Sequence, residues 1–240
     1  MRRLSLRIVQ HGLLLLLLAL GPAARAQDYE RPDFEMSCAK AVKLGLGKFM
    51  DVYGKQTEDY STAGQKWGFK YWADCKRPAN DALAARILSE ARRKQVEAAR
   101  EEFNRFGMAI WELKYLEAGG GTMWGLISVG SYAEREKFME TFIRTLAAPA
   151  RRSPRARRLV NTSLARIQRW LSASSRKPFT EGSEPEQVSQ NKKYYAETLQ
   201  ETQAILAKLR DLLKELPDVA AARLAAKMAS ETRDALADTQ

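Results

Sequence analysis

The stretch YAETLQETQAILAKLRDLLKEL, residues 195–216, carries the clearest structural signal in this 240-residue chain. Its core-type side chains recur in alternating steps of four and three residues, which places them on one face of a long helix. These residues are Tyr195, Leu199, Thr202, Leu206, Leu209, Leu213 and Leu216. Pro217 ends the pattern, and an alanine-rich stretch to about Ala237 completes a predicted helical hairpin. This heptad face either packs inside the chain or joins two chains into a homo-oligomer.

Helical spacing also dominates the residues before this hairpin, and the alternating β-branched runs typical of strands are absent. Cys38, Phe49 and Tyr53 share one stripe, which we expect Gly54 to stop, and Thr57 can start the next helix. We therefore predict an all-α fold. Its parts are a helical domain clipped by a disulfide (27–148), a basic connector with a short helix (149–182) and the helical hairpin (183–240).

The predicted disulfide joins Cys38 and Cys75, the two cysteines of the chain. They lie near the start of one predicted helix and the end of the next, so an antiparallel turn near residue 56 brings them together. In an oxidising compartment two cysteines most simply form one bridge. Closing a loop of this length contributes about 4 kcal/mol. Two cysteines are too few for a zinc site, so we predict no metal.

The first 26 residues have the three parts of a secretory signal peptide. Arginines precede the apolar run Leu13–Leu20, and a small-x-small cleavage site ends at Ala26. The apolar run is short for a membrane span, although an uncleaved anchor helix is the alternative. We expect a periplasmic or secreted protein that starts near Gln27.

Positive charge is concentrated in the predicted connector. Residues 141–180 hold ten Lys and Arg and no Asp or Glu, whereas residues 27–140 are neutral overall. Five of these bases, the arginine block, fall within eight positions: Arg151, Arg152, Arg155, Arg157 and Arg158. A local excess of this kind indicates either an anionic partner or a solvated linker. Export favours anionic lipid or cell-wall polymer over nucleic acid.

Three consecutive glycines, Gly119, Gly120 and Gly121, separate two predicted helices, and Thr122 can cap the second. We interpret them as a tight structural corner. The alternative, a phosphate-binding loop, needs a preceding strand and a following Lys-Ser/Thr, and both are missing.

Catalytic groups are scarce. The single histidine, His11, lies in the predicted signal peptide, so histidine-activated nucleophiles are excluded from the mature chain. Glu112 beside Trp111 is the one carboxylate that we would test, because a glycosidase needs paired carboxylates and aromatic side chains can line a sugar site. We predict no enzyme activity, no catalytic residue and no cofactor. The tryptophans are expected to fill the core.

Residues 89–148 resemble the LprI-type lysozyme-inhibitor N-terminal domain family. The resemblance rests on Arg100 and Phe103, Ala109, the Gly119–Thr122 corner, and Ala133 with Arg135. Cys38-Ala39-Lys40-Ala41 is loosely similar to the first cysteine motif of that family. The family usually has cysteines at the positions of Trp111 and Ser131, and an acidic residue at Met108. The resemblance implies an exported helical module that inhibits lysozyme in some members.

Two functions follow as expectations. The first is an exported non-enzymatic binding protein that inhibits a cell-wall hydrolase or serves as its immunity partner, or binds another envelope protein. The second is an envelope scaffold that binds anionic lipid or cell-wall polymer through the arginine block and self-associates through residues 195–216.

Overall fold

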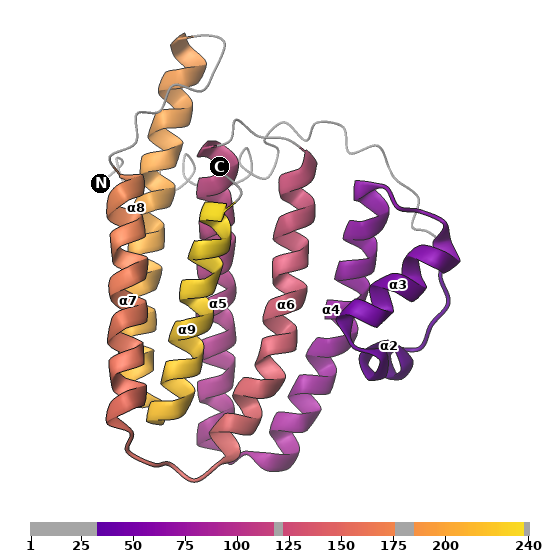
Figure 1. Cartoon of the computed structure of the whole chain (residues 1–240), viewed down its shortest axis with the longest axis horizontal. Helices are drawn as coiled ribbons and strands as arrows, with labels where there is room; N and C mark the ends of the chain where they lie inside the picture. The colour runs from indigo at the N-terminus through magenta and orange to yellow at the C-terminus, as the bar shows by residue number, and fades with distance from the viewer. Residues whose placement is uncertain (1–32, 118–121, 176–184, 238–240) are drawn as a thin grey trace, which may run out of the picture. The chain divides into compact units, whose positions relative to one another are not determined.

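The computed structural model describes residues 33–117, 122–175 and 185–237, and these residues form helices and no strand. The predicted signal peptide therefore lies outside the described residues. The helices are α2 (Cys38–Leu44), α3 (Leu46–Thr57), α4 (Thr62–Ile87), α5 (Glu90–Glu117), α6 (Thr122–Ala147), α7 (Pro154–Ser174), α8 (Pro185–Glu215) and α9 (Asp218–Ala237). The all-α prediction is confirmed. Figure 1 shows the long helices α4 and α6, α5 and α8, and α7 and α9 lying side by side.

The first predicted helix is two helices, because the chain bends at Gly45 and not at Gly54. Gly45 has a φ of 76°, a left-handed conformation that favours glycine, and it separates α2 from α3. Gly54 lies inside α3, where an added Cβ would come within 2.8 Å of the Tyr60 ring. Its role is close packing. Ser61, rather than Thr57, caps α4 by accepting a hydrogen bond from the Gly64 backbone N–H at 3.1 Å.

The predicted disulfide between Cys38 and Cys75 is present, with an S–S distance of 2.02 Å. It links the start of α2 to the middle of α4, since α4 continues through Pro78 to Ile87. The bridge indicates an oxidising environment. Around it lies a small core from α2, α3, α4, α6 and the residues just before α2: Met36, Ala41, Leu46, Phe49, Tyr53, Trp72, Ala73 and Ala133. Trp72 is 1% exposed and donates its indole N–H to the Ala41 carbonyl at 3.2 Å.

A larger core joins the remaining helices. It runs from Leu83 near the end of α4 to Ala229 in α9, and residues of α5, α6, α7 and α8 all contribute to it. Residues from Asp33 onward cluster into one compact unit. The three segments predicted from the sequence therefore share one core. The predicted break at Ser89 is observed between α4 and α5, and the one at Pro217 between α8 and α9.

The heptad face of α8 packs inside this core. All seven of its residues are at most 8% exposed, and Thr202 and Leu209 are fully buried. The face lies mainly against α5. The heptad pattern thus describes an intramolecular helix pair.

Candidate functional site

The arginine block belongs largely to a helix. Ser153 caps α7 by accepting a hydrogen bond from the Ala156 N–H at 3.2 Å, and Pro154 occupies the first position. Proline suits this position because its ring fixes a helical φ and its missing N–H has no partner in the first turn. Arg155, Arg157 and Arg158 therefore stand on the first turns of α7, the helix that lies within the predicted segment 149–182.

All five arginines of the block are exposed. Among the residues that the structure describes, no carboxylate lies within ion-pair distance of Arg151, Arg152, Arg155 or Arg158. Leu159 follows directly and is 46% exposed. The start of α7 thus combines four exposed arginines that form no ion pair among the described residues with an exposed apolar side chain.

Arg157 differs from the other four because it holds a carboxylate. Its Nε donates to Asp218 Oδ1 at 3.1 Å, and the Ser153 backbone N–H donates to Asp218 Oδ2 at 2.6 Å. The Ser153 N–H, followed by the Arg157 guanidinium, lowers the pKa of Asp218 below its usual range. Through these two hydrogen bonds Asp218 links the start of α7 to the start of α9.

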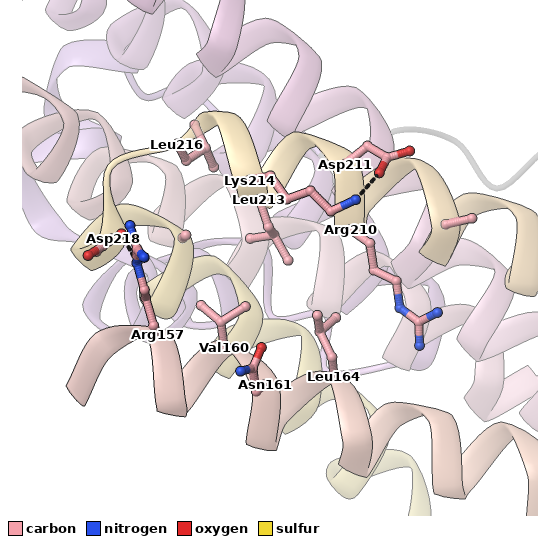
Figure 2. Close-up of a pocket in the computed structure, with 12 residues that line it drawn as sticks. Arg157, Val160, Asn161, Leu164, Arg210, Asp211, Leu213, Lys214, Leu216 and Asp218 are labelled. Carbon is pink, nitrogen blue, oxygen red and sulfur yellow. Dashed lines mark hydrogen bonds and ion pairs between the residues drawn. The ribbon is translucent and has the colours of Figure 1, made fainter. Parts of the chain in front are cut away.

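A cleft of about 610 Å³ opens beside this junction (Figure 2). It exists because α7 packs along α9 and touches α8 only sparsely. Val160 and Leu164 of α7 point toward Leu213 of α8 across it, and Leu216, just past the end of α8, also lines it. Val160 and Leu164 are only partly buried, so the cleft exposes an apolar surface.

The rim of the cleft is charged. Arg157 and Asp218 close one end, and Lys214 pairs with Asp211 at 2.7 Å on the side formed by α8. Arg210 lies toward the other end and donates to Gln168 Oε1 at 2.9 Å. Because Gln168 is neutral, the three cations of the rim exceed its two carboxylates by one charge.

Three carboxylates of α5, including the candidate Glu112, contact side chains of α5 or α8. Glu112 accepts a hydrogen bond from Tyr194 at 3.2 Å, and Glu117 accepts one from Tyr195 at 2.7 Å. Glu102 instead pairs with Arg105 at 3.2 Å and with Lys208 at 3.6 Å. Glu102, Glu112 and Glu117 thus each make a different structural contact.

Of the predicted aromatic and glycine sites, Trp111 belongs to the core, whereas the three glycines lie outside the described residues. Trp111 is 6% exposed and borders a smaller cavity of about 330 Å³, together with Phe69 and Glu134. The corner at Gly119–Gly121 lies outside the described residues, and α6 has Thr122 as its first residue.

Sequence reasoning missed a set of buried ionic side chains between α4, α5 and α6. Glu136 is fully buried, lies 3.5 Å from Arg100 Nε, and accepts a hydrogen bond from Asn80 at 3.2 Å. Burial raises its pKa, and the Arg100 charge opposes that rise. These residues are polar positions on otherwise apolar helix faces, and no sequence motif distinguishes them from surface positions.

In the described part of the chain, no group of three or more His, Cys, Asp or Glu side chains is arranged to hold a metal ion. The helices described here are also too short or too polar to cross a membrane. Comparison with protein-family models, with curated proteins and with solved structures finds no match to this chain.

Proposed function

We propose that this chain is an exported, non-enzymatic binding protein that attaches to an anionic lipid surface of the cell envelope. The observation that carries the proposal is the start of α7, where Arg151, Arg152, Arg155 and Arg158 are exposed without a carboxylate partner among the described residues. The disulfide and the predicted signal peptide support the compartment.

The contact combines charge with apolar insertion. Each arginine contributes about 1 kcal/mol near an anionic membrane at low salt, so four contribute about 4 kcal/mol, roughly a thousandfold in binding. Leu159 stands one turn from Arg155 and is 46% exposed, so it can enter the headgroup region when the arginines meet the phosphates. A polysaccharide would use the charges but not the leucine, which favours lipid.

The test is vesicle sedimentation with the mature, oxidised protein. We expect retention on phosphatidylglycerol vesicles at low salt, little retention on phosphatidylcholine, and release at 1 M salt, where the Debye length falls from about 10 Å to about 3 Å. Replacing Arg151, Arg152, Arg155 and Arg158 by glutamine should abolish retention with no loss of helix content. Arg157 is kept because it holds Asp218.

The matched control replaces four exposed lysines of α2 and α3 by glutamine: Lys40, Lys43, Lys48 and Lys55. It removes the same charge from another place and should remain on the vesicles. Equal retention of wild type and the arginine variant, or retention that salt does not change, would contradict the proposal.

A cell-wall hydrolase remains the second proposed partner, and it rests on the resemblance of residues 89–148. Inhibition or complex formation in a panel of hydrolases would favour it over lipid attachment.

A further inference from the structure

Attachment through the arginine block does not account for the cleft between α7, α8 and the start of α9. Its floor is apolar and its rim carries an excess of one positive charge. Its volume of about 610 Å³ falls within the range of about 300–1,000 Å³ that is typical of small-molecule sites. An apolar cavity with a cationic rim is complementary to an amphiphile with an anionic head.

We propose that this cleft binds one acyl chain of a single-chain anionic amphiphile such as a fatty acid. The proposal deepens the proposed function and rests on it for the anionic lipid environment. The chain lies against Val160 and Leu164 on one side and against Leu213 and Leu216 on the other. The carboxylate meets Arg210, whose guanidinium fork matches its two oxygens.

Arg210 is the best-placed cation of the rim for this role. The Arg157 charge is already matched by Asp218 at 3.1 Å, and the Lys214 charge by Asp211 at 2.7 Å. Arg210 donates to the neutral amide oxygen of Gln168, so its charge is not balanced by that contact. A bound carboxylate would supply the balance at that end of the cleft.

The length of the cleft sets the length of the chain. Ala207 of α8 and Leu216, which directly follows the last residue of α8, both line the cleft, and their separation of nine residues corresponds to about 14 Å along the helix axis. Bonds of about 1.5 Å advance an extended alkyl chain by about 1.3 Å per carbon, so the cleft takes about ten to twelve carbons.

Titration calorimetry below the critical micelle concentration tests the proposal, with octanoate, decanoate, dodecanoate and tetradecanoate as ligands. Affinity should rise about tenfold for each two carbons up to dodecanoate and then level off. Dodecyltrimethylammonium, which has the same chain and a cationic head, should bind at least tenfold more weakly than dodecanoate. Affinity that keeps rising through tetradecanoate, or equal binding of the two heads, would overturn the proposal.

Two variants locate the site. Ala207 is exposed in the lining, so Ala207→Trp should fill the cleft and remove dodecanoate binding, whereas Ala196→Trp, three turns away on the same helix, should not. Arg210→Gln should weaken dodecanoate about tenfold without weakening dodecyltrimethylammonium, because the lost charge attracts only the anionic head. Arg223→Gln, an exposed change on α9, is its control. Unchanged dodecanoate binding by Ala207→Trp and Arg210→Gln would place the ligand elsewhere.

The outcome is separable from that of the vesicle experiment. Ala207→Trp should still sediment with phosphatidylglycerol vesicles, because the arginine block is intact. The four-arginine variant should still bind dodecanoate, because Arg210 is intact. If the wild type fails to sediment with phosphatidylglycerol vesicles but binds dodecanoate, the surface proposal is refuted; if it sediments but shows no saturable dodecanoate binding, the cleft proposal is refuted.

Discussion

Glu231 and Arg135 form a buried ion pair whose disruption should be among the most costly single changes in this protein. Arg135 on α6 is 1% exposed and Glu231 on α9 is 4% exposed, with Nη1 and Oε2 3.1 Å apart. Asn104 on α5 accepts a further hydrogen bond from Arg135 Nε at 3.0 Å. Gly107 lies beneath the pair, where an added Cβ would come within 2.2 Å of Arg135 Nη1. Lys227 on α9 lies 3.9 Å from the other carboxylate oxygen of Glu231, so three helices meet at this group of charges.

The expected losses in the free energy of unfolding follow from the burial of the Arg135 and Glu231 side chains. Glu231→Leu leaves the Arg135 guanidinium buried without its carboxylate, which should cost about 3–5 kcal/mol. The double variant Glu231→Leu with Arg135→Met removes both charges and should recover at least half of that loss, because apolar side chains of similar size can replace a buried pair. Gly107→Ala should cost about 1–3 kcal/mol, because the ion pair must move aside.

Urea unfolding followed by circular dichroism provides the measurement. A loss of 3 kcal/mol at a slope of about 3 kcal/mol/M moves the unfolding midpoint by about 1 M. Asp74→Leu is the control: it breaks an exposed pair with Lys70, which is 57% exposed, and should cost less than about 1 kcal/mol. If Glu231→Leu costs no more than this control, or if the double variant is less stable than the single, the assignment of the energy to an uncompensated buried charge is wrong.

Three further outcomes are expected. Replacing Cys38 and Cys75 by serine should lower the free energy of unfolding by about 4 kcal/mol in a thermal or urea melt, and equal stability of both forms would contradict this. The lowered pKa of Asp218 means that its contribution is present above the pKa of the unfolded chain and is lost as pH falls through the lower folded value. Wild type should therefore lose stability more steeply than Asp218→Asn below about pH 4, and parallel pH profiles would count against the Ser153 and Arg157 contacts. A chain ending at Pro149 should unfold without a cooperative transition, because it exposes the larger core, and a sharp transition would show that the N-terminal helices fold alone.

The sequence predicted features that depend on periodicity or on cysteine pairing. The spacing of Leu199 to Leu216 specified a buried helix face, because a 3.5-residue repeat constrains which side chains align. The disulfide followed from there being two cysteines on either side of one turn region. The predicted helix breaks at Ser89 and Pro217 are confirmed. At both positions the local preference of the sequence to end a helix agrees with the fold.

Predictions from the helix-breaking preference of single residues were wrong where tertiary packing outweighed that preference. Gly54 would end an isolated helix, yet here it allows the Tyr60 ring to approach α3. Pro78 removes one helical N–H, but α4 continues past it while packed along α6. For the candidate site, charge counting found the arginines of the block. It did not find the cleft, because Arg210 and Val160 come together only through the way α7 and α8 lie on α9.

The disulfide encloses only the smaller of the two cores, and this gives the protein unequal sensitivity to its redox environment. Both sulfurs belong to α2 and α4, around Phe49 and Trp72, whereas the larger core from Leu83 onward contains no cysteine. A reductant should therefore release α2 and α3 as a local unfolding unit while amide protons in α5, α8 and α9 stay protected from exchange. Hydrogen exchange on the reduced protein would then show faster exchange of amide protons in α2 and α3 than in the helices of the larger core. The N-terminal helices would respond to the redox state of the surroundings, and the larger core would not.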